Sequence, residues 1–204
     1  IAGNSAVPEN TSQLPQNMVA LFHFGRSGTG LLHSLIDDHP EISSLPSIYC
    51  RGFFNPGVWN SIAQGGCQGL PERFAKRFAV LFDASSPQET PGKLYEDSSS
   101  LGIKEGMANV GKSRNEVLLV DKEKFCTAVY SLMQNFENIN AGIFFLIIHA
   151  AYDLAVGNNR KKNTAFYHIH NPDDYAILNF LRYFPAARLV MMVTKLRFGR
   201  SWRC

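Results

Sequence analysis

The feature that most constrains the fold is a short apolar segment that ends at a glycine-rich turn. Residues 18–24 (MVALFHF) form a continuous apolar run, which is typical of a β-strand buried on both faces. After the turn, apolar residues recur at helical spacing at Leu31, Leu32, Leu35 and Ile36. Pro40 ends this helix. The segment therefore predicts a strand, a tight loop and a helix in immediate succession.

The last third of the chain repeats this alternation. Residues 165–170 and 188–193 each predict a buried strand, and a helix at 172–184 joins them, with Asn171 as its N-cap. The buried stripe of that helix is predicted at Ile177, Leu178, Leu181 and Phe184. Helices that alternate with buried strands favour an α/β fold, with a parallel sheet flanked by helices on both faces.

The middle of the chain is less regular. Residues 70–84 predict a short helix, and residues 116–121 (EVLLVD) predict a strand. Asp121 then begins a helix whose apolar face is Phe125, Val129, Leu132, Met133 and Phe136. A further helix is predicted at 141–156, which is far shorter than the roughly 20 apolar residues of a membrane span. Residues 157–163 (GNNRKKN) predict an exposed basic loop.

Composition limits the organisation and the partners. Residues 1–17 are polar and predict a flexible leader, followed by a single domain at 18–204. The net charge of +3 is too small to indicate a nucleic-acid partner. The cysteines are widely spaced, which favours free thiols in a reducing compartment such as the cytoplasm. They are Cys50, Cys67, Cys126 and Cys204.

The turn itself has the composition of an anion site. A helix amino terminus that follows a buried strand presents unpaired N–H groups and a partial positive charge. Glycines let the backbone curl around a phosphate, hydroxyls add donors, and an arginine adds a guanidinium fork. The candidate ligand-binding residues are Gly25, Arg26, Ser27, Gly28, Thr29 and Gly30. The alternative is an ordinary glycine turn with a surface arginine.

A second glycine motif lies at residues 106–113 (GMANVGKS) and has the spacing of an ATPase phosphate loop. That motif requires a buried strand before it and a helix after it. Here the preceding residues are mostly polar, and a predicted strand follows. We therefore interpret the motif as a chance match and Lys112 as a solvated lysine.

The stretch GRSGTGLLHSLIDDHPEI (25–42) resembles the sulfotransferases that use 3′-phosphoadenosine 5′-phosphosulfate (PAPS). The 5′-phosphosulfate loop of that family reads [KR]-S-G-T-[TGS]-[WL]-L after a strand, and often continues to HP-[EQ]-I. The resemblance implies a P-loop nucleotide-hydrolase-like fold, PAPS as sulfuryl donor, and Arg26 as a catalytic and cofactor-binding residue. It implies no metal. The acceptor would be a small molecule or a carbohydrate with a hydroxyl or amine.

A second match carries the catalytic base. Cytosolic family members have a strand that ends K-T-H-x-P, and this chain has HIHNP at 168–172. The resemblance places His170 at the base and His168 at the lysine position. Glu41 and Glu105 are alternative bases. The remaining histidines stand in apolar or helical segments, which favours structural roles for them. They are His23, His33, His39 and His149. The aromatic residues Tyr49, Phe53, Phe54 and Trp59 fit either an acceptor pocket or the core.

A third match fails. The family usually has R-[DE]-P after the last strand, whereas Thr194 stands at the arginine position here. The resemblance therefore implies a domain that is incomplete at its carboxyl end. Three hypotheses follow: a PAPS-dependent sulfotransferase, a phosphotransferase of related fold, and an inactive remnant. The identity of the acceptor and the oligomeric state stay open.

Overall fold

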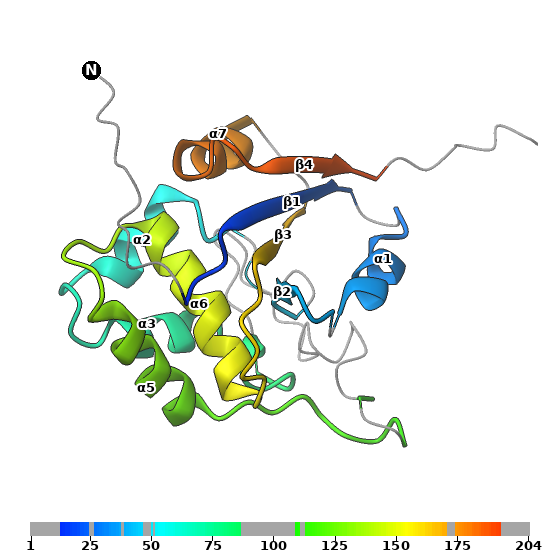
Figure 1. Cartoon of the computed structure of the whole chain (residues 1–204), viewed down its shortest axis with the longest axis horizontal. Coiled ribbons are helices and arrows are strands. Elements are labelled where there is room, and N and C mark those ends of the chain that lie inside the picture. Colours follow the sequence, from blue (N-terminus) through cyan, green and yellow to red (C-terminus); the bar gives the residue numbers. More distant parts are fainter. Residues whose placement is uncertain are drawn as a thin grey trace, which may run out of the picture.

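A computed structural model describes most of the chain and contains one parallel sheet (Figure 1). The described residues are 13–24, 27–37, 39–46, 50, 52–86, 109–110, 113–170 and 174–192. The four strands are β1 (Asn17–His23), β2 (Ile42–Ser44), β3 (Thr164–His170) and β4 (Arg188–Met191), in the order β2-β3-β1-β4. Every neighbouring pair is parallel. The predicted α/β class with a parallel sheet is confirmed.

Helices cover both faces of the sheet. On β3, Tyr167 packs against Phe145 of α6 (Ala141–Ala155) and stacks on Phe180 of α7 (Asp174–Tyr183). The next residue, His168, contacts His33 of α1 (Thr29–Ile36). Because successive side chains of a strand point to opposite faces, α1 lies on one face and α6 and α7 on the other. This confirms the prediction of helices on both faces.

An aromatic core fills the space on the α6 side. Figure 1 shows α2 (Pro56–Ala63), α3 (Leu70–Arg77) and α5 (Lys122–Met133) gathered beside α6. Phe53 is fully buried at their centre and contacts the rings of Phe54, Trp59, Phe74, Phe78, Phe144 and Phe145. Of the two interpretations of these aromatics, the core is therefore the one that the structure favours for Phe53 and Phe54. Tyr49 lies outside the described residues.

Side-chain caps fix the beginnings of the two long helices. The Asp121 carboxylate accepts hydrogen bonds from the backbone N–H groups of Glu123 and Lys124, at 2.9 and 3.0 Å, and so begins α5. Asn140 accepts from the N–H of Ile143 at 3.0 Å and begins α6. Both predicted helices are confirmed. The helix predicted at 70–84 ends at residue 77, and a 3₁₀ turn at 79–81 follows it.

Two predictions about strands are wrong. Residues 116–121 form isolated antiparallel bridges, Val110 with Glu116 and Asp83 with Leu119, and they do not belong to the described sheet. Residues 188–191 do form β4, but all four are exposed. β4 pairs with β1 on one side and is the last strand in the order, so its residues are not enclosed.

The apolar stripes of two helices also differ from the prediction. On α7, Phe180 is the fully buried residue, whereas Leu178 is 64% exposed. On α1, Leu31 and Leu35 are exposed, and the helix buries Thr29 and His33 instead. The buried face of α1 is therefore polar, and it lies against the part of the sheet that carries the candidate site.

The packed region begins before residue 18. Leu14 is 2% exposed and belongs to the core, within the segment that was predicted as a leader. The backbone N–H groups of Gln16 and Asn17 both donate to the carbonyl of Asn163, at 2.9 and 3.0 Å. Residues 1–12 and 193–204 lie outside the described residues.

Two further observations concern cysteines and membranes. Among the described residues, Cys50, Cys67 and Cys126 are free thiols, as the sequence predicts. No described helix has the length and apolar character needed to cross a bilayer.

Candidate functional site

The candidate site lies where β1 and β3 end. The two strands are parallel, and their last residues, His23 and His170, are paired. The chain leaves β1 at His23 and enters α1 at Thr29, so the glycine-rich loop follows directly from this edge. Ligands of open parallel sheets bind outside the carboxyl ends of the strands. The predicted loop and the predicted base are thus at the same edge of the sheet.

The described part of the loop has the geometry of an uncapped helix entrance. The Ser27 hydroxyl donates to the carbonyl of Phe24 at 2.8 Å and closes the turn. Gly28 is the N-cap of α1 with φ of 80°, a left-handed conformation that favours glycine, and it has no side chain with which to cap. The first turn of α1 contains no acidic residue. The end of the helix can therefore accept an anion without competition from a carboxylate of its own first turn.

Two of the predicted anion-binding residues, Gly25 and Arg26, lie outside the described residues. Of the others, Ser27 and Thr29 are buried, and Gly28 and Gly30 are exposed. Thr29 Oγ1 lies 3.2 Å from Nδ1 of His23. The hydroxyl of Thr29 is therefore engaged with a histidine, while its backbone belongs to the first turn of α1.

Beside the loop, four histidines form what we call the histidine chain: His170, His23, His168 and His33. Nδ1 of His170 lies 3.3 Å from Nδ1 of His23. Nε2 of His23 lies 3.2 Å from Nδ1 of His168. Nε2 of His168 lies 2.7 Å from Nδ1 of His33. Each ring thus contacts the next one in space, from the carboxyl edge of the sheet to α1.

The sequence pattern groups His168 with His170, whereas it predicts separate structural roles for His23 and His33. The alternation of β3 places His168 and His170 on one face, and this signal is visible in the sequence. The contact of His23 with this pair depends on the register of β1 on β3, which no local pattern reveals. The position of His33, one turn into the helix after the loop, was the available hint.

Burial keeps the middle of the histidine chain neutral. His168 is 4% exposed, and desolvation together with the neighbouring His33, His23 and His170 lowers its pKa to about 3. A neutral imidazole has one N–H donor and one acceptor nitrogen. His168 therefore donates to one of its two histidine neighbours and accepts from the other.

The arrangement does not resemble a metal centre. The histidines follow one another in a line, whereas a metal requires three or four ligand atoms around one point. Within the described part of the chain, no group of three or more histidine, cysteine or acidic side chains has a geometry that could hold a metal ion.

Of the alternative bases, Glu41 is placed far from the site. It lies just before β2, and Thr164, the first residue of β3, donates its N–H to the carbonyl of Glu41 at 3.1 Å. His170 is at the other end of β3, which at about 3.3 Å per residue is roughly 20 Å away. Glu41 is thus at the amino edge of the sheet. Glu105 and Lys112 lie outside the described residues.

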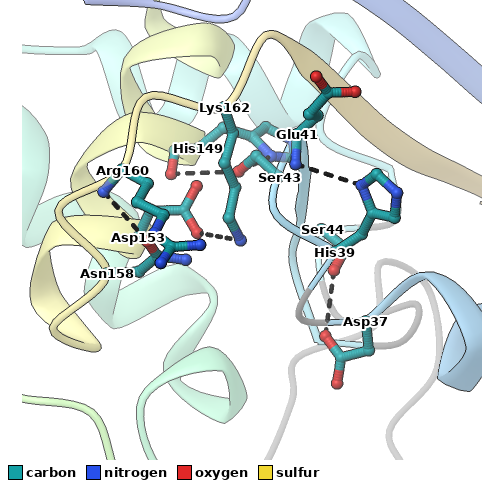
Figure 2. A network of polar contacts seen from close by, with 10 residues as sticks. All are labelled: Asp37, His39, Glu41, Ser43, Ser44, His149, Asp153, Asn158, Arg160 and Lys162. Atoms are coloured by element: carbon teal, nitrogen blue, oxygen red, sulfur yellow. Dashed lines mark hydrogen bonds and ion pairs between the residues drawn. The ribbon is translucent and has the colours of Figure 1, made fainter.

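A second polar network lies at the β2 edge of the sheet (Figure 2). Nδ1 of His149 on α6 lies 3.1 Å from the hydroxyl of Ser43 on β2, and the ammonium of Lys162 lies 2.8 Å from the carboxylate of Asp153. Lys162 is 7% exposed, so the prediction of a wholly exposed basic loop is wrong at this residue. The buried ammonium of Lys162 is stabilised by the carboxylate of Asp153 in the last turn of α6, because a buried charge requires a partner.

A pocket of about 930 Å³ opens beside this network. Its polar wall contains His33, Asp37, Ser44, Asp153, Arg160 and Lys162. Burial raises the pKa of Asp153, although hydrogen bonds from Lys162 and Ser43 act in the opposite direction. His33 belongs both to this wall and to the histidine chain, so the pocket and the candidate site share one side chain.

Buried histidines should make the fold sensitive to acid. Burial, with a smaller effect of Lys162, lowers the pKa of His149 to about 3, and His168 has the same value. The unfolded chain therefore binds more protons than the folded chain between about pH 6.5 and pH 3, and stability should fall as the pH falls through this window. At about 1.4 kcal/mol per pH unit for each histidine, roughly 2 kcal/mol each should be lost between pH 6.5 and pH 5.

Urea unfolding at pH 7 and pH 5 measures this loss. The raised pKa of Asp153 opposes it, since that group binds its proton more readily in the folded chain. His149→Gln should reduce the difference between the two pH values, whereas His39→Gln, at an exposed histidine, should not. Equal stability of the unaltered chain at both pH values would contradict the assignment of these histidines as buried and neutral.

No protein-family model, no curated protein and no solved structure matches this chain.

Proposed function

We propose that this chain transfers a sulfuryl group from PAPS to a hydroxyl of a small-molecule or carbohydrate acceptor. The observation that carries the proposal is the position of the GRSGTG segment. It joins the end of β1 to the beginning of α1, and the pairing of His23 with His170 brings the candidate base to the same edge. The described residues of two separate matches to the sulfotransferase pattern, 27–30 and 168–170, thus lie at one end of the sheet, although they are about 140 residues apart in the sequence.

The fold class is consistent with this proposal. A parallel sheet flanked by helices on both faces is what the resemblance implies, and the P-loop-like fold is the finer form of that expectation. The first loop lacks the lysine with which an ATPase loop reaches the outer phosphates, which favours sulfuryl transfer over phosphoryl transfer. In this proposal the 5′-phosphosulfate binds at the amino end of α1.

The chemistry assigns a separate task to each part of the site. The acceptor oxygen forms a bond to sulfur as the bond from sulfur to the bridging phosphate oxygen breaks, and the acceptor loses its proton. The loop amides and the guanidinium of Arg26 stabilise the charge that develops on the leaving oxygen. His170 accepts the proton of the hydroxyl, a role that suits an imidazole near neutral pH. The products are a sulfate ester and adenosine 3′,5′-bisphosphate.

Calorimetric titration with adenosine 3′,5′-bisphosphate tests the choice of loop. Arg26→Ala should weaken binding by about 1.5–3 kcal/mol, because a charge-assisted hydrogen bond to phosphate is lost. Lys112→Ala in the second glycine motif is the matched control and should leave affinity unchanged. The opposite pattern, with binding lost in Lys112→Ala and retained in Arg26→Ala, would assign the nucleotide to the second motif and would favour a phosphotransferase.

A further inference from the structure

We infer that the histidine chain is a proton path, which carries the acceptor's proton from His170 to His33 at the wall of the pocket beside α1. The inference rests on the proposed function, because sulfuryl transfer to a hydroxyl releases one proton that the site must dispose of. It adds roles for three histidines that the resemblance does not assign: His23, His168 and His33.

The four rings form a continuous series of contacts. Both nitrogens of His23 and both nitrogens of His168 contact a neighbouring histidine, at distances from 2.7 to 3.3 Å. In each N···N contact one nitrogen must donate and the other must accept. A neutral ring has one N–H, so if one ring donates its hydrogen bond toward His33, the other rings of the histidine chain must donate in the same direction. In the only other arrangement every hydrogen bond donates toward His170. The two arrangements differ in which terminal ring, His33 or His170, has a proton on Nε2.

Thr29 can accommodate either arrangement. Its hydroxyl lies 3.2 Å from Nδ1 of His23, the same nitrogen that contacts His170. A hydroxyl both donates and accepts, so Thr29 can serve this nitrogen whether or not it carries a proton. Thr29 also begins α1, which ties the path to the loop that we propose for the phosphosulfate.

Each ring takes up one proton and gives up another during the transfer. Initially each ring donates toward His33. The acceptor O–H bond breaks and its proton binds Nε2 of His170, which passes its Nδ1 proton to Nδ1 of His23. His23 gives its Nε2 proton to Nδ1 of His168, and His168 gives its Nε2 proton to Nδ1 of His33. His33 releases its Nε2 proton on its pocket side. After the sulfate ester leaves, the protons move back in the opposite direction. Nε2 of His33 takes up a proton on the pocket side, and Nε2 of His170 releases one to solvent at the vacated acceptor site, which restores the first arrangement.

The burial of the rings confines the proton to the histidine chain while it moves. Three of the four rings are buried, with exposed fractions of 3% for His23, 4% for His168 and 7% for His33. Solvent therefore does not reach the middle of the histidine chain directly. The lowered pKa of His168 means that a proton does not rest there, and it passes onward to the next ring. The titratable groups that line the pocket together with His33 are Asp37 of the α1 end, Tyr152 and Asp153 of α6, and Arg160 and Lys162 of the following loop. Asp153 is paired with Lys162, so the proton passes to the exposed carboxylate of Asp37, the C-cap of α1, which also accepts a hydrogen bond from Ser44 at 3.2 Å.

Nuclear magnetic resonance tests the path without any activity. In protein labelled with ¹⁵N at the histidines, couplings through hydrogen bonds should connect Nε2 of His168 with Nδ1 of His33, and Nδ1 of His168 with Nε2 of His23. One N–H resonance per contact and a single direction of donation are expected. Absence of both couplings in the folded protein would overturn the path.

Kinetics of His33→Gln supply the second test, because this variant leaves the candidate base and the loop unaltered. The kcat for sulfuryl transfer should fall about tenfold with the KM for PAPS unchanged, and the dependence of kcat on the D₂O fraction should change from curved to linear. His39→Gln is the matched control, because His39 is not part of the histidine chain. Urea unfolding verifies that both variants fold. Full kcat in His33→Gln, with active unaltered protein, would overturn the path alone. Absence of sulfuryl transfer in the unaltered protein would overturn the path and the proposed function together.

Discussion

Replacing His170 with asparagine should lower the turnover of sulfuryl transfer by about 10²–10⁴-fold, the usual contribution of a general base. Asparagine is smaller than histidine but keeps an uncharged polar group close to the position of Nδ1, and it cannot accept the proton of the acceptor hydroxyl. Nucleotide affinity should not change, since the phosphosulfate is assigned to the loop and to the end of α1. Initial rates at saturating PAPS, together with a titration by adenosine 3′,5′-bisphosphate, separate the two effects.

Glu41→Gln is the matched control for this experiment. Its carboxylate was the alternative base, and the structure places it at the amino edge of the sheet, far from His170. The control should retain full turnover. Full turnover in His170→Asn together with loss of turnover in Glu41→Gln would move the site to the opposite edge of the sheet and would contradict the proposed arrangement.

Lys162→Met should cost about 3–5 kcal/mol of unfolding free energy at pH 7, because it leaves the buried Asp153 carboxylate without its partner. The ion pair is 2.8 Å long, and its side chains are 6% and 11% exposed for Lys162 and Asp153. The loss should shrink as the pH falls, since the pKa of Asp153 is already raised by burial and a protonated carboxyl needs no cation. Urea unfolding at pH 7 and pH 5 measures both quantities.

Two further variants make this prediction specific. Lys161→Met changes the neighbouring exposed lysine and should alter stability by less than about 0.5 kcal/mol. Combining Lys162→Met with Asp153→Leu should recover most of the loss, because two apolar side chains replace the pair. A cost below about 1 kcal/mol for Lys162→Met alone would show that the pair behaves like a surface ion pair and is solvated.

The parts of the fold that could be predicted from the sequence are those that local physics determines. The apolar run before the glycine turn predicts β1, and the turn residues predict the beginning of α1. Asp121 begins α5 because its carboxylate satisfies N–H groups two and three residues ahead, which depends on neighbours in the sequence alone. Such signals do not require knowledge of the rest of the molecule.

The predictions that failed depend on distant neighbours. An apolar run such as 188–191 does not reveal whether its strand has one neighbour or two, and among the described strands β4 pairs with β1 alone. Leu31 and Leu35 have helical spacing, but α1 presents His33 to the sheet because His168 lies there. Lys162 stands in a polar segment and becomes buried because its ammonium pairs with Asp153 in the last turn of α6. In each case the deciding contact is tertiary, and spacing along the chain does not encode it.

The candidate site shows the same division. The loop and His170 were identified from short patterns that resemble one family. The histidine chain was not, since its contacts join residues 135 to 147 positions apart in the sequence. Only the parallel register of β1 on β3 brings these side chains together.

The most direct test of the central claim is the mass of the product after incubation with PAPS and a panel of hydroxylated acceptors that includes sugars and phenols. We predict that at least one acceptor gains a single sulfuryl group, with equimolar adenosine 3′,5′-bisphosphate, and that Arg26→Ala and His170→Asn both diminish this product. An acceptor that gains a phosphoryl group from ATP, with no acceptor gaining a sulfuryl group from PAPS, would contradict the account.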